Sequence, residues 1–294
     1  LGITPSAVSK ALSNHPRISK KTKTLVYEAV NTLGYQPNLL ASALRKGKSN
    51  LVGIIVPRAH SNFFSSVVEN IEETLNAKGY NIVITQSNES YHKECRNIDA
   101  LLHIQVDGII ASLAKETTDL GHFNKVISKG VPLVMFDRSE DALQTDFIGI
   151  DDFESSKLVV NHLAEQGCKR IAHIAGFENT RIYKNRIEGY KAALSENGLP
   201  LEPNLLVQSK LTIEDGRRIM QQFLQLPKPP DAVYAARDYA ALGALQTLIG
   251  NNIKVPEDIA LVGFSNEPFT ALVNPAISTI DQHSGQIGTL AAKS

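Results

Sequence analysis

The sequence is poor in cysteine and has no tryptophan: Cys95 and Cys168 are the only two thiols in 294 residues. They lie far apart and have no neighbours at the spacing typical of zinc ligands. The pattern therefore argues against a disulfide framework and against a zinc site. We expect two reduced thiols, in or near the core, and no metal.

Long hydrophobic runs are also missing. No apolar stretch approaches the roughly 18–20 residues that cross a bilayer as a helix. The first residues, LGITPSAVSKALSNH, lack the charged and then apolar build of a secretory signal. We therefore expect a globular, cytoplasmic protein without a membrane partner.

The chain has no net charge, but its charges are segregated. Residues 1–48 hold eight basic residues and one acidic residue, a net of +7, and residues 49–294 hold 22 basic and 29 acidic residues, a net of −7. A small basic module beside a larger acidic region is typical of a protein whose module binds a polyphosphate such as DNA. A basic face that contacts only solvent is the simpler alternative.

Polar caps and apolar spacing predict two short helices at the N-terminus. Thr4 followed by Pro5 is a helix-start signal, because a hydroxyl accepts from free amides and proline fits the first turn. A second helix is predicted between Ser19 and Gly34. The expected apolar stripes are Val8, Ala11 and Leu12 in the first helix, and Leu25, Val26, Ala29, Val30 and Leu33 in the second.

From Leu51 onward, short apolar runs such as LVGIIV and VPLVMFD alternate with amphipathic segments, and a second set of this kind begins near Asp151. The alternation predicts an α/β fold with two similar lobes, each a doubly wound parallel sheet. A helix from Ser284 is expected to return to the first lobe. The predicted domains are a helical headpiece (1–37), a hinge helix and linker (38–48), a first lobe (49–150 with 281–294) and a second lobe (151–280).

The string GITPSAVSKALSNHPRISKKTKTLVYEAVNTLGYQPNLLASALRKGKSNLVGIIVP resembles the headpiece, hinge and first strand of the lactose-repressor/galactose-repressor (LacI/GalR) family. The resemblance continues through VDGII, VPLVMFDR, RIAHIAG, the R-x-x-G-Y of Arg186 to Tyr190, ALGAL and LVGFSN. It implies a homodimeric repressor with a helix-turn-helix headpiece and two periplasmic-binding-protein-like lobes, between which a small, sugar-like effector binds. Family members also have a helix before the first residue and a segment after the last, so we expect a chain truncated at both ends.

The resemblance implies that Pro5 to Ser13 form a recognition helix in the major groove of operator DNA. Base-facing candidates are then Pro5, Ser6 and Lys10, and phosphate contacts are expected from Thr4, Ser9, Asn14 and Ser19. For each serine taken alone, an ordinary cap or a solvated hydroxyl is an equally good interpretation.

A leucine of the hinge carries a sharper hypothesis. Leu44 matches the family leucine that is wedged between base steps in the minor groove, which costs a few kcal/mol of unstacking but kinks the duplex. Its spacing alone would favour ordinary helix packing. Arg45, with Lys46 and Lys48, is expected to contact the DNA backbone or groove, with solvated charge as the alternative.

Effector contacts are implied where the sequence matches the family in the two lobes. Asp137 and Arg186 match effector-binding positions, and Phe63 and Phe64 match positions that line the cleft, although core aromatics are an equal alternative on composition alone. Two residues depart from the pattern: Arg237 stands where many relatives carry Asn, and Ser265 where many carry Asp. The loss of an acid and the gain of a cation favour an anionic ligand, unless Arg237 pairs with Asp238 or Asp137.

Two other classes of protein are alternatives. A transport-type binding protein has two such lobes, but it needs export and no basic helical module. An enzyme is suggested only by an acidic cluster near His162; helix-start charges and an exposed histidine explain these residues more simply. The cluster comprises Asp151, Asp152 and Glu154. Because the chain has no glycine-rich phosphate loop, nucleophile elbow or spaced metal ligands, we expect no catalysis and no cofactor.

Overall fold

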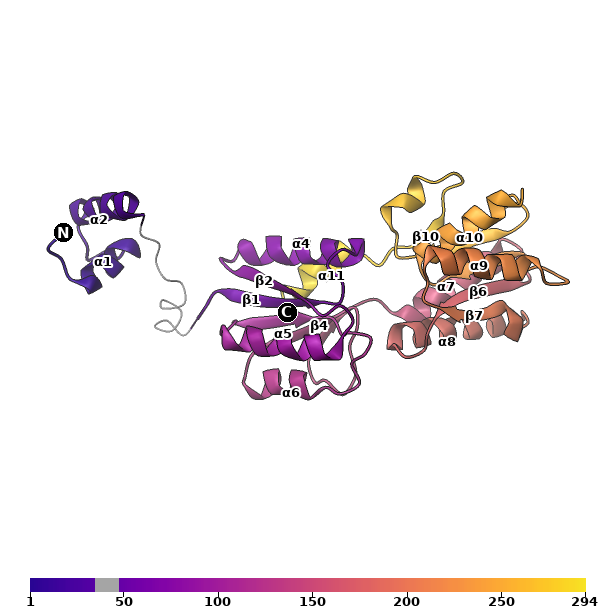
Figure 1. The fold of residues 1–294 in the computed structure, drawn as a ribbon, viewed down its shortest axis with the longest axis horizontal. Helices are drawn as coiled ribbons and strands as arrows, with labels where there is room; N and C mark the ends of the chain where they lie inside the picture. Colours follow the sequence, from indigo (N-terminus) through magenta and orange to yellow (C-terminus); the bar gives the residue numbers. More distant parts are fainter. Residues whose placement is uncertain (35–47) are drawn as a thin grey trace. The chain divides into compact units, whose positions relative to one another are not determined.

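The computed structural model describes residues 1–34 and 48–294 and divides into two compact units, Leu1–Ser49 and Asn50–Ser294 (Figure 1). The predicted hinge helix lies within residues 35–47, outside the described residues. None of the described helices is long and apolar enough to cross a membrane.

The N-terminal unit contains two helices, α1 (Pro5–Leu12) and α2 (Lys20–Leu33). Both begin where predicted. The hydroxyl of Thr4 accepts from the amide of Ala7 at 3.2 Å, and Ser19 accepts from Thr22 at 3.2 Å. Gly34 ends α2 in the left-handed conformation, at a φ of 59°.

The predicted apolar stripes of this unit are only partly buried. Ala11 and Val26 are fully buried at the contact between α1 and α2, whereas Leu25 is 42% and Leu33 79% exposed. Two short helices have one contact face each, so residues at the edge of a stripe have nothing to pack against within the pair. Leu25 and Leu33 therefore belong to the predicted stripe of α2 but are exposed in this pair.

The first lobe is a parallel sheet in the order β2-β1-β3-β4-β5. Strand β1 pairs in register with both neighbours, Ile54 facing Ile84 on one side and Ile110 on the other. Helix α6 and strand β5 were not predicted, because neither contains a long periodic apolar pattern. The elements are β1 (Leu51–Val56), α4 (Asn62–Asn76), β2 (Asn81–Gln86), α5 (Tyr91–His103), β3 (Gly108–Ala111), α6 (Gly121–Ser128), β4 (Leu133–Phe136), β5 (Asp146–Ile148) and α11 (Ser284–Ala291).

The second lobe is a parallel sheet in the order β10-β9-β8-β6-β7, with two short 3₁₀ turns, Pro203–Leu205 and Pro268–Ala271. The prediction of two doubly wound lobes after a helical front end is confirmed. The elements are α7 (Asp152–Glu165), β6 (Ile171–Gly176), α8 (Arg181–Glu196), β7 (Leu206–Ser209), α9 (Ile213–Leu224), β8 (Ala232–Ala235), α10 (Asp238–Gly250), β9 (Ala260–Phe264) and β10 (Ser278–Ile280).

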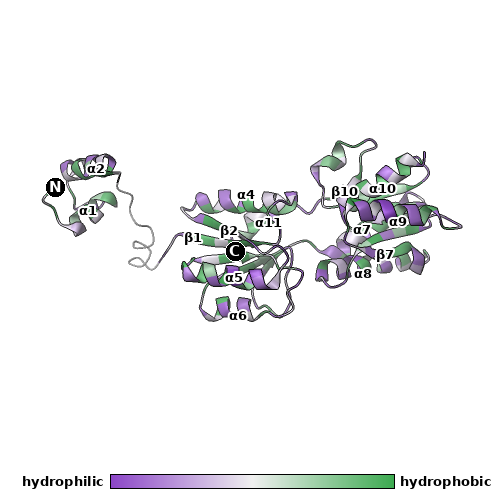
Figure 2. Ribbon diagram, in the orientation of Figure 1, coloured by the Kyte–Doolittle hydropathy of each residue, from purple (hydrophilic) through white to green (hydrophobic). Residues whose placement is uncertain are grey.

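Two segments, 149–151 and 281–283, connect the lobes in the described part of the chain. After the second of them, α11 packs against α4, and its Ile287 and Ala291 join the core of the first lobe. Figure 2 shows hydrophobic residues concentrated in the strands and on the helix faces that cover them. In a doubly wound sheet the strands end on one edge, which is where ligands bind.

Two glycines allow close packing of α9 against α10. A β-carbon on Gly216 would lie 2.1 Å from the carbonyl oxygen of Ala240, and one on Gly243 would lie 2.0 Å from that of Ile213. Both contacts are with backbone, which cannot rotate away as a side chain can. The two helices can therefore approach only while both positions lack a side chain.

We predict that Gly243→Ala lowers the free energy of unfolding by about 2–3 kcal/mol, because α9 must move away from α10. Urea denaturation measures the change. Gly250→Ala, at the end of the same helix, is the matched control, since a β-carbon there meets nothing within 4 Å. Equal stability of the two variants would contradict the packing argument.

Candidate functional site

A cavity of about 480 Å³ lies in the two-lobed unit and is lined by both lobes. Its walls come from α8, from the start of α4, and from the segments that follow β1, β2, β3 and β4 in the first lobe and β6, β7, β8, β9 and β10 in the second. All six predicted effector residues line it: Phe63, Phe64, Asp137, Arg186, Arg237 and Ser265. That they contact an effector stays a prediction. Their meeting in one cavity follows from the parallel sheets, which bring segments distant in sequence to one edge.

Arg186 is held rigidly in the wall of this cavity. Its side chain is 4% exposed, its Nε donates to Asp152 at 2.8 Å, and its Nη1 donates to the carbonyl oxygen of Ala236 at 2.8 Å. The guanidinium carbon lies 3.5 Å from the centre of the Phe264 ring. The charge is thus buried, paired and stacked, the condition under which a buried guanidinium is tolerated.

The acidic residues at the start of α7 have different structural roles. Asp151 caps the helix, accepting from Phe153 and Glu154 at 3.0 Å each, as expected for a helix-start charge. Asp152 instead forms the buried pair with Arg186, so its interpretation as a helix-start charge alone is wrong. His162 is exposed in the last turn of α7.

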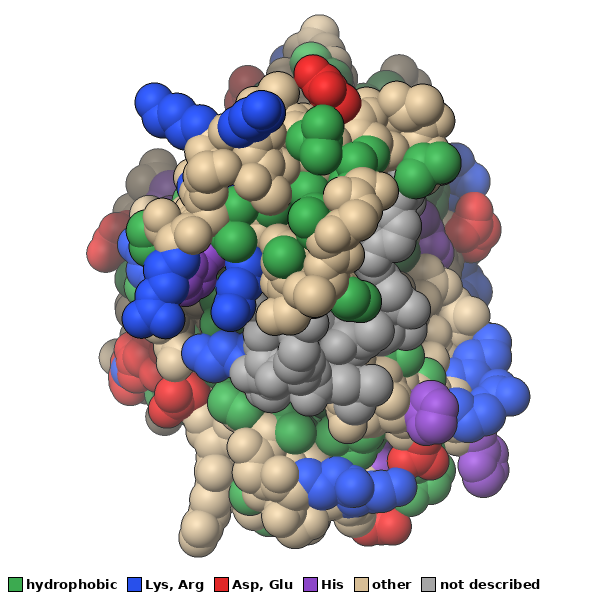
Figure 3. Space-filling model, turned by 90° about the vertical axis from the view of Figure 1, so that its left-hand side faces the viewer, with side chains coloured by type: hydrophobic (Ala, Val, Ile, Leu, Met, Phe, Trp, Pro, Cys, Tyr) green, Lys and Arg blue, Asp and Glu red, His purple; other side chains and the backbone are tan. Residues whose placement is uncertain are grey.

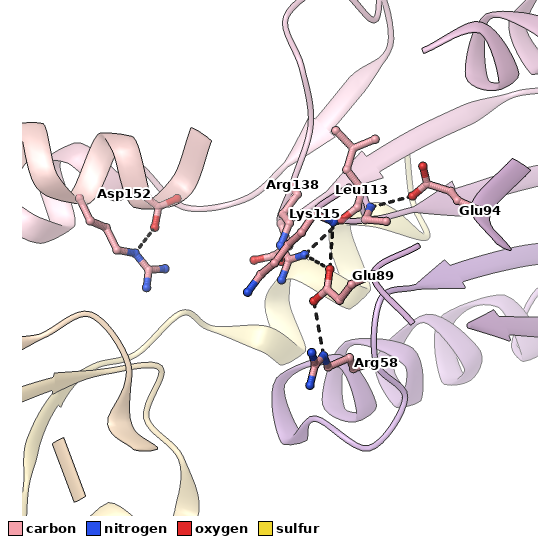
Figure 4. A network of polar contacts seen from close by, with 10 residues as sticks. Arg58, Glu89, Glu94, Leu113, Lys115, Arg138 and Asp152 are labelled. Atoms are coloured by element: carbon pink, nitrogen blue, oxygen red, sulfur yellow. Dashed lines mark hydrogen bonds and ion pairs between the residues drawn. The ribbon is translucent and has the colours of Figure 1, made fainter. Parts of the chain in front are cut away.

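Glu89 organises the first-lobe side of the cavity and was not predicted. Arg138 donates to it at 2.8 Å, the amide of Lys115 at 3.0 Å, and Arg58 lies 3.5 Å away (Figure 4). Burial opposes ionisation of Glu89, but the charge and hydrogen bonds of Arg138 and Lys115 hold its pKa below the ordinary value. Glu89 therefore binds two arginines and a loop at once.

The same loop, which follows β3, is anchored from behind by Glu94. This fully buried carboxylate accepts from the amide of Ala114 at 2.7 Å and the hydroxyl of Thr117 at 2.6 Å. Its Oε1 lies 2.9 Å from Nε2 of His122. Figure 4 shows Glu94 on the far side of Leu113 from Glu89. Two carboxylates thus fix the loop that carries Lys115 into the cavity wall.

Asp137 occupies an unusual backbone and electrostatic position. It follows β4 at a φ of 59°, a conformation that Asp and Asn adopt more readily than most residues. Burial raises the pKa of its carboxyl to about 6, although Arg138, 3.6 Å away, opposes the rise. The side chain can therefore act as a hydrogen-bond donor or as an acceptor near neutral pH.

Arg237 pairs with neither acid considered for it. Its guanidinium lies 4.9 Å from the centre of the Tyr239 ring. The carboxylate of Asp238 instead accepts from the amide of Glu267 at 2.8 Å and the hydroxyl of Thr279 at 2.7 Å. Among the described residues, no carboxylate oxygen lies within 4 Å of the Arg237 guanidinium. The alternative of pairing with Asp238 or Asp137 is therefore wrong.

Ser265 and several residues missed by sequence reasoning complete the cavity wall. Ser265 directly follows β9 at a φ of 120°, and its amide donates to Ile280 at 2.9 Å. The missed residues share a signal that was available, because most of them lie just beyond a predicted strand. They include Arg58, Glu89, Lys115, Arg138, Phe177, Lys210, Thr212 and Glu267.

In the N-terminal unit, the predicted DNA contacts divide into two groups. Thr4 and Ser19 cap helices, and Asn14 accepts from Nζ of Lys23 at 2.7 Å, so these three have local structural roles. Pro5, Ser6 and Lys10 are exposed along α1, and Ser9 is half-buried. Leu44 and Arg45 lie outside the described residues. Figure 3 shows several lysine and arginine side chains protruding from the face that it draws.

We predict that Asp137→Asn raises the free energy of unfolding by about 2–3 kcal/mol at pH 8, since each pKa unit is worth about 1.4 kcal/mol. The folded protein favours the protonated carboxyl, so the destabilisation is absent below the unfolded pKa near 3.8, grows between pH 3.8 and about 6, and is complete above pH 6. Urea denaturation at pH 8 and pH 4 should show the gain at pH 8 and its near disappearance at pH 4.

Asp99→Asn is the matched control, because that carboxylate is 60% exposed and pairs with Lys125 at the surface. Its effect should stay within about 0.5 kcal/mol. An Asp137→Asn variant that is no more stable than the parent at pH 8 would contradict the assigned cost of burying this charge.

Comparison with known proteins finds a matching family model in each of the two units. Residues 2–38 match the model for bacterial regulatory proteins of the lacI family, and residues 160–294 match a periplasmic binding protein-like domain. The transcriptional repressor CytR of Escherichia coli is 32% identical over 97% of this chain and 83% of its own. The regulator DegA of Bacillus subtilis is 29% identical over 98% of this chain and 85% of its own.

Solved structures agree with this assignment. A lac repressor dimer bound to operator and an anti-inducer matches with a TM-score of 0.88 at 24% identity, over 99% of this chain and 88% of that one, and shows the fold. A complex of the regulator CelR with cellobiose matches at 0.75 and 25% identity, with the same coverage. These relatives are transcription regulators, which excludes the enzyme alternative. The chain belongs to the lacI family of bacterial regulatory proteins and is a DNA-binding transcriptional repressor with a periplasmic-binding-protein-like effector domain.

Proposed function

We propose that this repressor binds a small, sugar-like metabolite in the cavity between its lobes, and that occupancy of the cavity sets its affinity for operator DNA. The observation that carries the proposal is the convergence of six expected effector residues from both lobes on one cavity of about 480 Å³. A volume of this size suits a small metabolite. Such a protein acts in the bacterial cytoplasm, where its DNA is.

The chemistry of the cavity wall suits a hydroxylated ligand. Asp137 and Ser265 offer groups that can donate or accept, and Arg186 is already oriented by Asp152, so binding costs little ordering of its side chain. Phe63 and Phe64 pack edge to face, with ring centres 5.2 Å apart; both belong to the core of the first lobe, and the part of each ring that lines the cavity offers a small apolar surface.

On the DNA side, we assign base reading to α1. Pro5, Ser6 and Lys10 are exposed on this helix, and Lys10 can donate to the acceptors of guanine in the major groove. Thr4, Ser9, Asn14 and Ser19 would contact phosphates. Leu44 would enter the minor groove, with Arg45 beside it on the backbone.

Control of DNA binding requires two copies of the chain. A repressor dimer places two reading helices on two half-sites, so the affinity depends on how the lobes hold the two headpieces. Effector binding would change the angle between the lobes of each copy and so the spacing of the headpieces. The coupling free energy between effector and operator measures this effect directly.

The first experiment selects sites for the full chain from a pool of random DNA duplexes and then titrates salt. A palindrome with a flexible central step is expected, and Leu44→Ala should weaken it at least tenfold, because the wedge is lost. Sugars from a library are then added to the complex of the protein with the enriched site. A sugar that releases the protein from this DNA supports the proposed control by an effector. Ligand binding without any change in operator affinity would favour the transport-type binding protein instead.

We predict that Lys10→Ala weakens binding to the enriched site by about tenfold and relaxes the preference at one base pair in each half-site, as expected for loss of a base contact. Lys78→Ala, an exposed lysine just after α4, is the control and should change neither. If Lys10→Ala instead weakened all sequences equally, Lys10 would be a phosphate contact.

A further inference from the structure

The cavity between the lobes has an excess of positive charge. Six cationic residues line it against three carboxylates, a formal excess of three. A charge that is removed from water without a counter-charge is costly. The net charge of the residues that line a cavity therefore indicates the charge of the ligand that binds there. The cations are Arg58, Lys115, Arg138, Arg186, Lys210 and Arg237, and the acids are Glu89, Asp137 and Glu267.

Three of the six cations are already paired with carboxylates of the protein. Arg138 and Arg58 share Glu89, at 2.8 and 3.5 Å, and Arg138 also lies 3.6 Å from Asp137. Arg186 is paired at 2.8 Å with Asp152, which does not itself line the cavity. Glu89, Asp137 and Asp152 thus face these three arginines.

The other three cations have no such partner. In the described part of the chain, no carboxylate oxygen lies within 4 Å of the charged groups of Lys115, Lys210 or Arg237. Lys115 lies over the ring of Tyr183, with 5.5 Å from Nζ to the ring centre. Glu267 attracts Arg237 only from beyond pairing distance. Glu89 likewise attracts Lys115 without a contact within 4 Å. These cations therefore lack a direct ion pair.

Three helices begin at the cavity wall, and of these only α4 has neither an acidic residue in its first turn nor a side-chain cap. The cap residues of α4, α9 and α10 are Ser61, Thr212 and Arg237, and all three line the cavity. The N-terminus of a helix carries a partial positive charge and free amide donors. The side chain of Ser61 makes no capping hydrogen bond, so amides at the start of α4 are not satisfied by their cap.

We propose that the effector is a hydroxylated metabolite that carries an oxyanion, a carboxylate or a phosphate, bound by Lys115 from the first lobe and Arg237 from the second. This rests on the proposed function only in placing the effector in this cavity. A neutral sugar would cover these cations without compensating them, whereas an oxyanion accepts charge-assisted hydrogen bonds from both. Because the two cations belong to different lobes, the anion also draws the lobes together.

The test starts with inorganic phosphate, which needs no knowledge of the natural effector. Isothermal titration calorimetry on the full chain, at constant ionic strength, should detect phosphate binding. Arg237→Gln and Lys115→Gln should each weaken it at least tenfold, because each removes a charged donor. Arg217→Gln is the matched control, since Arg217 is exposed on α9, bonds to Gln246 and does not line the cavity.

Matched ligand pairs then separate the two sources of the oxyanion. Glucose is compared with gluconate and with glucose 6-phosphate, and ribose with ribose 5-phosphate, by calorimetry and by release or retention of the selected operator. We expect the anionic member of at least one pair to bind ten times more tightly than its neutral counterpart, and Arg237→Gln to abolish that preference. If gluconate binds most tightly, the effector is a sugar acid; if a phosphorylated sugar binds most tightly, it is a sugar phosphate.

The outcomes that overturn the proposal differ from those that overturn the proposed function. No phosphate binding, or binding that Arg237→Gln and Lys115→Gln leave unchanged, refutes the oxyanion site. A neutral sugar that alters operator affinity as strongly in Arg237→Gln as in the parent refutes it too, while leaving the repressor with a neutral effector. Absence of a selected operator concerns only the proposed function.

Discussion

The buried pair of Arg186 and Asp152 is the interaction on which the second-lobe wall of the cavity depends. It joins α8 to the start of α7, directly after the chain has crossed from the first lobe. The same guanidinium bonds to the backbone beyond β8 and stacks on a residue of β9. One side chain therefore fixes four elements, and loss of either charge would leave the other buried and unpaired, at a cost of about 3–5 kcal/mol.

In the first lobe, the cavity wall is held in place by carboxylates. Glu89 and Glu94 hold one loop from two sides through its backbone amides, and Arg138, which is paired with Glu89, also donates to the carbonyl oxygen of Leu113 in this loop. The charge of Arg138 and the amide of Lys115 stabilise the ionised form of Glu89 although this side chain is largely buried. In the first lobe, the buried acids beside the cavity thus hold structure, whereas Lys115 lines the cavity without a direct ion pair.

Much of the fold could be predicted because its signals are local. Helix caps at Thr4 and Ser19 and apolar runs such as Leu51–Val56 determine their own segments whatever their surroundings. The effector candidates came from matching segments to a family. The roles of Glu89 and Asp152 could not be read this way, because each depends on a partner distant in sequence, Arg138 and Arg186. Local spacing carries no information about such pairs, and it also missed the short elements α6 and β5.

The lobes are joined by two segments, 149–151 and 281–283, in the described part of the chain. A ligand that contacts both walls stabilises the arrangement of the lobes in which it makes the better contacts. Chemically different ligands can therefore favour the same arrangement, provided that each of them contacts both walls.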